Sequence, residues 1–312
     1  MTNKGLTLAA IICLAAGTIS AQVVRGAAPS QISTMGTKDA RPDGKGRGIA
    51  DGRGPARAAA RPARTGNGIF YHGGPIMTGT TNVYYIWYGN WSSGSQSILL
   101  NLASYIGGSP YYNINTTYTN GSGAHIANSV NYVTSSADNY SQGTSFGDSG
   151  VQAIVSSAIS SGKLPADSRG VYFVLTSPDV KETSGFCSSY CGWHTHATIA
   201  GTDIKFAFVG NPSTQCPSSC EEQTASSPNG DPGADGMASV ISHELEEAAS
   251  DPDLNAWYDN RGSENADKCA WTFGTTKTAS NGSLYNMTLG SRQYLIQRNW
   301  VNASGGYCAL SY

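Results

Sequence analysis

The sequence predicts an α/β (α+β) fold in which helices pack on a mixed β-sheet and disulfides staple the loops. Three runs of aromatic and β-branched residues end in turn residues and are typical of buried strands: 82–91, 170–179 and 204–212. Two segments have helical spacing of apolar residues and stop at Gly or Pro, at 95–108 and 147–165. Six cysteines lie among Gly, Ser and Pro residues in the second half of the chain.

The start of the chain predicts export. Lys4 precedes an apolar stretch, residues 6–21, which has the length of a secretory h-region and is too short to span a bilayer. Small residues near Ala21 offer a cleavage site, so we expect residues 1–21 to be a signal peptide. No later segment is apolar enough to be transmembrane, and the mature protein is therefore expected to be secreted and extracellular.

Residues 22–65 form a basic segment that carries nine Lys or Arg against three Asp, with repeated Ala, Gly, Pro and Arg. The segment has almost no apolar periodicity and cannot bury enough surface to order itself. We expect it to be a disordered linker or a propeptide that is removed.

Residues 66–312 are long enough for one large domain with a sizeable core. This part carries nine Lys or Arg against eighteen Asp or Glu and has no basic stripe, which argues against a nucleic-acid partner. Twelve of the eighteen acids lie between Glu221 and Asp267, where Arg261 is the single opposing cation. Such clustering indicates a bound cation.

Six cysteines remain once the signal peptide is removed, and an even number in an oxidising compartment indicates disulfides. Sequence cannot separate the fifteen possible connectivities. Pairing of nearest neighbours is the expectation: Cys187 with Cys191, Cys216 with Cys220, and Cys269 with Cys308. A thiolate zinc site built from the two C-x-x-x-C pairs is the alternative.

The segment "DGMASVISHELEEAASDPDLNAWYD", residues 235–259, begins with a predicted helix. Asp235 is expected to cap its start, and the helix must end near Asp251 because Pro252 disfavours helical geometry there. At 100° per residue its apolar side chains share one face, and Glu246 is expected to point into solvent.

Two residues of this helix, His243 and Glu247, stand at i and i+4 and project side by side at the margin of the apolar face. With Glu244 between them the motif reads H-E-x-x-E, a zincin-like active-site helix in which Glu247 replaces the second histidine. We expect His243 and Glu247 to bind a metal and Glu244 to act as general base.

A third protein ligand should follow the helix. Glu264 is the favoured candidate, with Asp267 behind it, and Asp253 is the alternative. Zinc is the expected cation, although a carboxylate ligand makes manganese or calcium more acceptable than in a two-histidine site.

Calcium is the competing cation. The loop 251–262 places oxygen side chains as an EF-hand does, but it has Ala256 where Gly is needed and Gly262 where the bidentate Glu belongs. The turn 229–236 is a second candidate, through Asn229, Asp231 and Asp235, unless it is a simple turn.

Seven ordered blocks resemble those of the phosphate-induced protein, or EXORDIUM-like, family of secreted proteins, over residues 67–310. The blocks read "YHGGPIMTGTTNVYYIWYGNW", "SRGVYFVLTSPDV", "GFCSSYCGWH", "FVGNPSTQCPSSC", "PNGDPGADGM", "NAWYD" and "ENADKC". The resemblance implies an extracellular protein, associated in plants with the cell wall, and no established catalytic activity. Plant members typically carry S-E-L-A-E where this chain has "HELEE", so His243 makes this chain resemble a metal-competent version.

The same resemblance covers two more histidines, His72 in "YHGGP" and His194 in "CGWH". Each is expected either to stand beside the metal ligands or the substrate, as Asp267 is, or to be a hydrogen-bonded structural histidine.

Two main functions stay open from sequence. One is a secreted zinc-dependent, peptidase-like hydrolase acting on an extracellular peptide or a cell-wall polymer. The other is a non-catalytic extracellular or cell-wall-associated protein stabilised by calcium or another cation. No G-x-S-x-G element supports a serine hydrolase.

Overall fold

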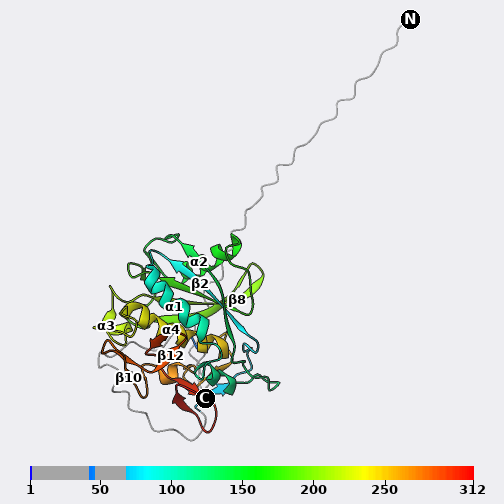
Figure 1. The fold of residues 1–312 in the computed structure, drawn as a ribbon. Helices are drawn as coiled ribbons and strands as arrows, with labels where there is room; N and C mark the ends of the chain where they lie inside the picture. Colours follow the sequence, from blue (N-terminus) through cyan, green and yellow to red (C-terminus); the bar gives the residue numbers. More distant parts are fainter. Residues whose placement is uncertain (2–41, 46–67) are drawn as a thin grey trace. The chain divides into compact units, whose positions relative to one another are not determined.

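The structure, a computed structural model, describes Met1, residues 42–45 and residues 68–312. The chain divides into two units, Met1–Thr37 and Lys38–Tyr312, of which only the second is described beyond a single residue (Figure 1). The predicted signal peptide and most of the predicted basic segment lie outside the described residues. Within the described part, no helix combines the length and apolar character needed to cross a membrane.

A five-stranded mixed sheet forms the centre of the second unit, in the order β3-β2-β5-β8-β7. Strands β3, β2, β5 and β8 run parallel, and β7 is an antiparallel edge strand beside β8. Their bounds are Thr81–Tyr88 for β2, Val130–Asp138 for β3, Gly170–Thr176 for β5, Gly192–Ile199 for β7 and Thr202–Gly210 for β8. Strand β5 is buried along its whole length, as expected for a parallel strand covered on both faces.

The three predicted strands are confirmed as β2, β5 and β8, each ending two or three residues before the predicted boundary. The predicted helices are also confirmed, as α1 (Ser93–Tyr105) and α2 (Asp148–Ser160). Strands β3 and β7 were not predicted. Both are sheet edges with many partly exposed residues, so neither shows the continuous apolar run that marks a central strand.

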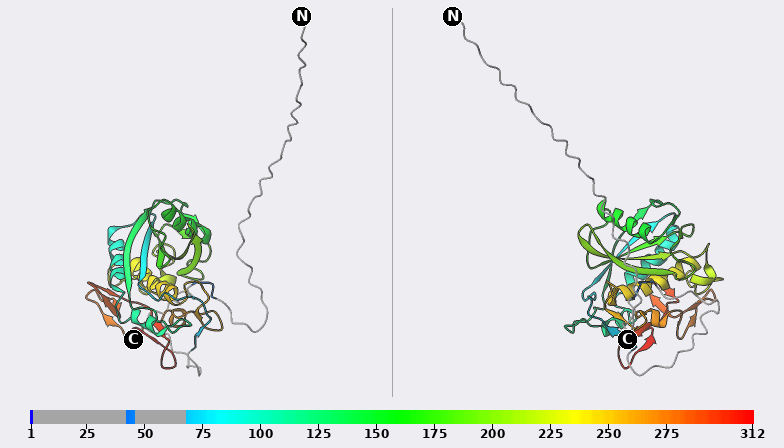
Figure 2. Two further views of the ribbon diagram at one scale, coloured as in Figure 1. Left: turned by 90° about the vertical axis from the view of Figure 1, so that its right-hand side faces the viewer. Right: turned by 180° about the vertical axis from the view of Figure 1, so that it is seen from behind.

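Helices cover both faces of the sheet. Helix α4 (Pro232–Ser250) packs against α1 and against β7 and β8, whereas α2 contacts β5, β7 and β8 (Figures 1 and 2). Gly192 faces α4, since a Cβ at this position would lie 2.5 Å from Val240. Trp193, the next residue of β7, must therefore face the α2 side, because side chains alternate along a strand.

Helix α4 starts earlier than predicted. Asp231, not Asp235, caps the helix by accepting a hydrogen bond from the backbone N–H of Ala234, and Pro232 occupies the first turn. Proline is favoured at this position because its missing N–H is not needed there. Asp235 instead accepts hydrogen bonds from Asn229.

The prediction that Glu246 points into solvent is wrong. Its side chain is fully buried and accepts a hydrogen bond from Asn299 Nδ2, at the start of β14 (Asn299–Val301). The prediction assumed that only one face of the helix is buried. The hairpins after α4 cover the other face as well, so nearly the whole helix is buried.

The shorter elements lie around these layers. The two-stranded sheets pair β1 (Phe70–Tyr71) with β9 (Trp257–Tyr258), β4 (Ser145–Phe146) with β6 (Lys181–Glu182), β10 (Lys277–Thr278) with β11 (Leu284–Tyr285), β12 (Met287–Leu289) with β13 (Arg292–Tyr294), and β14 with β15 (Tyr307–Ala309). The remaining short helices are η1 (Tyr112–Thr117), α3 (Pro217–Cys220) and η2 (Asp267–Cys269).

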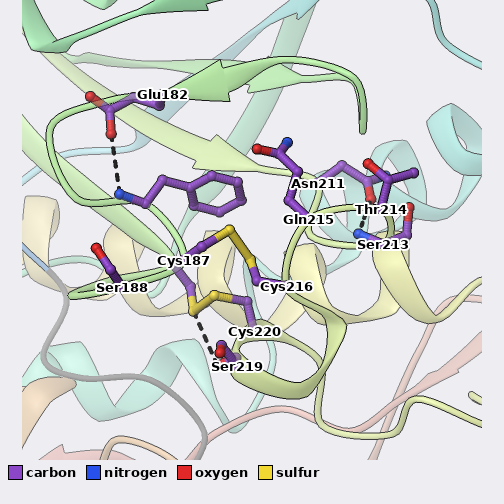
Figure 3. The surroundings of a disulfide bond; sticks show 12 residues. Glu182, Cys187, Ser188, Asn211, Ser213, Thr214, Gln215, Cys216, Ser219 and Cys220 are labelled. Atoms are coloured by element: carbon purple, nitrogen blue, oxygen red, sulfur yellow. Dashed lines mark hydrogen bonds between the residues drawn. A yellow bond between two sulfur atoms is a disulfide. The ribbon is translucent and has the colours of Figure 1, made fainter.

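Two of the three expected disulfide pairings are wrong. Cys187 pairs with Cys216 and Cys191 with Cys220, while Cys269 pairs with Cys308 as predicted. Cys216 caps α3 and Cys220 is its last residue, so the two stand at i and i+4 on one side of this short helix, and Figure 3 shows them beside Cys187. All six cysteines are thus in disulfides, which also rules out the thiolate zinc alternative.

Candidate metal centre

A cluster of two histidines and four carboxylates lies between α4, the start of β7 and the segment that enters η2. The segment is fixed to the helix, because Asp267 donates its backbone N–H to Glu247 Oε1 and accepts one from Glu264 at Oδ2. The cluster consists of His194 on β7, His243, Glu244 and Glu247 on α4, and Glu264 and Asp267.

On one side of the cluster, His243 meets two carboxylates. Its Nε2 atom lies 3.0 Å from Glu247 Oε1 and 3.6 Å from Asp267 Oδ1. One donor atom from each of these three residues lies within 4.8 Å of the other two. The i, i+4 spacing predicted for His243 and Glu247 is therefore realised in the helix.

On the other side, His194 lies against Glu264 and Glu247. Its Nε2 atom is 3.2 Å from Glu264 Oε1 and 3.8 Å from Glu247 Oε2. Glu247 thus stands between the two histidines, with one oxygen toward each. His194, Glu244 and Glu247 form a second group whose donor atoms converge within 4.8 Å.

Glu244 is the most unusual member. Its side chain is fully buried, and neither carboxylate oxygen has a hydrogen-bond partner among the described residues. A Cβ at Gly192 would lie 3.1 Å from Glu244 Oε1, so the absence of a side chain at Gly192 lets β7 approach this carboxylate closely. A buried carboxylate without a partner is energetically expensive and indicates a missing charge or donor.

The two histidines have opposite electrostatic surroundings. Burial lowers the pKa of His194 to about 4, although the negative charge of Glu247 opposes the shift. Burial also acts to lower the pKa of His243, but Glu247, Asp267 and Glu244 together raise it well above the usual value. His194 is therefore neutral at physiological pH, which is the form of imidazole that binds metals.

The carboxylates repel one another. Burial raises the pKa of Glu244 well above its usual value, with His243 acting in the opposite direction. Burial and the neighbouring Glu247 likewise raise the pKa of Glu264. The ionised forms of these carboxylates are therefore costly inside the cluster unless a positive charge compensates them, and a divalent cation would supply that charge.

The predicted third ligands take different positions. Glu264, the favoured one, contacts His194 but belongs to neither group of converging donors, whereas Asp267 belongs to one of them. Asp253, the alternative, lies apart with His196, Asp203 and Lys205. His194, which the sequence placed beside the metal ligands or the substrate through the "CGWH" block, lies in the cluster on β7.

The remaining predicted residues have partners elsewhere. His72 stacks on Tyr258 with ring centroids 3.6 Å apart, and its Nε2 lies 3.2 Å from the Tyr258 carbonyl oxygen, which favours a structural role. In the candidate calcium turn, Asp231 caps α4 and Asn229 bonds Asp235, so these oxygens serve the turn itself. In the EF-hand-like loop, Asp251 Oδ1 accepts backbone N–H groups from two residues of the loop.

The fold and the cluster define a disulfide-linked α/β protein that carries a buried histidine and carboxylate centre. Comparison with known proteins identifies its family. The chain belongs to the family described as "Phosphate-induced protein 1 conserved region", whose model matches residues 69–309. The resemblance seen in the sequence is thereby confirmed.

Several curated plant proteins are similar to this chain. Protein EXORDIUM-like 3 of Arabidopsis thaliana is 34% identical over 76% of this chain and 81% of its own length. Protein EXORDIUM-like 5 of the same plant is 32% identical over 74% of each chain. Protein PHOSPHATE-INDUCED 1 of Nicotiana tabacum is 27% identical over 60% of this chain and 66% of its own length. No solved structure matches the chain significantly.

Proposed function

We propose that this chain is a secreted metal-binding protein of the phosphate-induced family, and that its buried cluster binds one divalent cation, with zinc preferred, for peptidase-like hydrolysis. One observation carries the proposal. The donor atoms of His194, Glu244 and Glu247 converge within 4.8 Å, while both oxygens of Glu244 lack a partner among the described residues. Buried charges of this kind are normally paired or coordinate a metal.

For zinc we propose His243, His194 and Glu247 as the ligands. The two histidines belong to different converging groups, and Glu247, which belongs to both, directs one oxygen toward each of them. Two imidazoles and one carboxylate are a set that catalytic zinc sites use. His194 replaces the predicted Glu264, because the oxygens of Glu264 belong to neither converging group while they contact His194 Nε2. Glu264 contacts His194 through Nε2, the nitrogen that also faces Glu247, so it stands beside the proposed ion.

Glu244 has the properties of a general base in this arrangement. It stands next to His243 on α4, is buried, and has oxygens that no described group occupies. A bound zinc would supply Lewis-acid polarisation and make a nearby water more acidic. In this proposal Glu244 accepts the proton that such a water loses as it attacks a peptide or cell-wall substrate.

A second candidate function is a non-catalytic extracellular protein whose cation, calcium included, only stabilises the fold. Its support is the burial of the cluster, in which His243 is 4% exposed and Glu244 fully buried. Four carboxylates also suit a hard cation such as calcium. The two functions share the site and differ in whether Glu244 performs chemistry.

Metal analysis of the purified full-length protein tests the proposal. We expect about one zinc per chain, lost in His243→Ala and retained in Glu244→Gln, with His196→Ala as a matched control that keeps the metal. Hydrolysis of a peptide library should fall by roughly a hundredfold to ten-thousandfold in Glu244→Gln. Calcium alone, with no hydrolysis, would favour the structural function, and a metal-free wild-type protein that cannot be loaded with zinc or calcium would exclude both.

A further inference from the structure

Residues 42–45 lie along the outer edge of β7. The backbone N–H of His194 donates to the carbonyl of Gly44 at 2.8 Å, and Lys45 forms an antiparallel bridge with Trp193. Both contacts are to backbone, so this short segment adds to the sheet at its edge. An edge strand presents unpaired backbone groups and is a ready site for such addition.

The side chain of Lys45 enters a socket on the α2 side of the sheet. Its Nζ atom lies 2.7 Å from Asp148 Oδ2, and it donates to Tyr190 Oη at 3.4 Å. The same ammonium lies 4.6 Å and 5.0 Å from the ring centroids of Tyr190 and Trp193. A carboxylate combined with two aromatic faces selects a cationic side chain.

The hydroxyl oxygen of Tyr190 in this socket is oriented to accept a hydrogen bond. Tyr190 Oη donates its own proton to Glu182 Oε2 at 2.7 Å, which leaves the oxygen free to accept from Lys45. Glu182 also accepts the backbone N–H groups of Ser184 and Phe186, so its position is fixed by the loop before β7. The orientation of Tyr190 therefore does not depend on Lys45.

The position before the lysine must be glycine. Gly44 has a left-handed backbone with φ +69°, and a Cβ there would lie 1.9 Å from the carbonyl oxygen of His194. Any side chain would push the segment away from β7. The edge therefore selects a glycine followed by a basic residue.

The polar part of this socket lies at the surface, while its two aromatic rings, Tyr190 and Trp193, are buried with the core. The side chains of Lys45 and Asp148 are 25% and 48% exposed. The strand that Lys45 joins is already paired along its other edge with β8. The segment can therefore leave without opening the sheet.

We propose that the outer edge of β7, with the socket of Asp148, Tyr190 and Trp193, is a binding site for an extended peptide that contains Gly-Lys or Gly-Arg, and that residues 42–45 occupy it in cis. Backbone pairing to β7 supplies affinity, and the socket supplies specificity. Peptide binding at this edge does not require a cation, so the inference is independent of the proposed metal centre.

Competition between the tethered segment and an added peptide tests this site. The probe is a fluorescent peptide of residues 40–48, "ARPDGKGRG", titrated into the full-length protein and followed by anisotropy. A tethered segment competes at an effective concentration on the order of millimolar. We expect Gly44→Ala, which displaces it, to bind the peptide at least tenfold more tightly than wild type does.

Gly123→Ala is the matched control, because Gly123 has a similar φ of +79° but no neighbour within 4 Å of its Cβ position. It should bind the peptide as weakly as wild type. Lys45→Ala, which empties the socket without touching the backbone, should strengthen binding in the same direction as Gly44→Ala. Peptide affinity unchanged in both Gly44→Ala and Lys45→Ala, or unfolding of both, would overturn the proposal.

A second pair of measurements tests the socket. In the Gly44→Ala protein, Asp148→Asn should lower the affinity for the Gly-Lys peptide at least tenfold. A probe with glutamate in place of the lysine should likewise bind the Gly44→Ala protein at least tenfold more weakly than the lysine probe does. Equal binding of the lysine and glutamate probes would show that the contact is non-specific and would also overturn the proposal.

Discussion

Strand β7 carries two histidines two positions apart, His194 and His196, which stand on the same face of the strand in opposite surroundings. His194 is fully buried and meets Glu247 and Glu264. His196 is partly exposed, and its Nδ1 lies 2.9 Å from Asp203 Oδ1 and 3.6 Å from Asp253 Oδ1. Each histidine belongs to a group of donors close enough to hold a metal.

The two groups differ in how their charge is balanced. In the exposed group, Lys205 Nζ lies 2.6 Å from Asp203 and 3.7 Å from Asp253, so a cation of the protein already occupies the place of a metal. In the buried group, Glu244 has no such partner among the described residues. The same residue types therefore lack a compensating charge only in the buried group, where no lysine lies beside the carboxylates.

The largest expected difference in the free energy of unfolding is between alanine variants of these two histidines. His194→Ala removes a fully buried ring, which leaves a cavity, and takes away the hydrogen-bond partner of Glu264, so we expect it to lower the free energy of unfolding by about 3 to 5 kcal/mol. His196→Ala should change it by less than about 1 kcal/mol. Urea unfolding of both variants checks the pair. Equal losses would show that burial does not distinguish the two groups.

Two disulfides next to the buried end of β7 can be compared for their contribution to stability. Cys187–Cys216 and Cys191–Cys220 close nearly the same loop, since each joins residues 29 positions apart. Replacing all four cysteines by serine should lower the free energy of unfolding by about 3 to 4 kcal/mol, whereas breaking either bridge alone should lower it by only about 1 kcal/mol. Denaturant unfolding of the three variants measures the values, and additive single losses would contradict the redundancy.

Glu246 on helix α4 is a buried carboxylate that has a hydrogen-bond partner, unlike Glu244. Burial raises the pKa of Glu246 well above its usual value, although the hydrogen bond from Asn299 opposes the rise. Because the folded protein then favours the neutral carboxyl, Glu246→Gln should be tolerated within about 1 kcal/mol. Glu246→Ala leaves Asn299 unpaired and should lower the free energy of unfolding by about 1 to 3 kcal/mol.

Thermal unfolding of both Glu246 variants provides the measurement, with the metal content as a control. Neither change should alter metal binding, because Glu246 belongs to neither converging group. Loss of the metal in Glu246→Gln would show that the site extends farther along α4 than we propose.

The smallest change in the free energy of unfolding is expected for a substitution in the exposed group, at Asp203. Burial alone would raise the pKa of Asp203, but hydrogen bonds from Lys205 and His196 lower it below the usual 3.8. A carboxylate with a lowered folded pKa stabilises the protein above its unfolded pKa, and the effect is lost as the pH falls through the folded value. Asp203→Asn should therefore lower the free energy of unfolding by less than about 1 kcal/mol at pH 7.

Urea unfolding across this pH range checks the sign. The difference between Asp203→Asn and wild type should shrink once the pH is below 3.8. A difference that grows on acidification would contradict the ion pairing.

Sequence predicted the parts of the fold that local pattern determines. The central strands β2, β5 and β8 followed from continuous apolar runs, and the proximity of His243 and Glu247 followed from helical spacing. The start of α4 was missed although Asp231 and Pro232 carry a cap signal, because Asp235 offered a competing one.

The features that sequence did not predict depend on contacts between distant segments. The burial of Glu246 comes from Asn299, and the crossed disulfides come from two turns that lie side by side in space. The contact of Lys45 with Asp148 joins residues 103 positions apart. Such contacts between distant residues leave no periodic pattern in the sequence. Residues 22–65 were therefore predicted only as a basic segment, although residues 42–45 contact β7.

The bridge between Cys269 and Cys308 has a consequence for biosynthesis. It closes η2, which begins at Asp267, against a residue 39 positions farther along the chain. A nascent chain that has emerged only as far as Asp267 already contains every donor of the cluster but lacks the cross-link that fixes the last of them. A cation held by the proposed centre would therefore be loaded after this disulfide has formed, so oxidation of Cys269 and Cys308 should precede metal uptake.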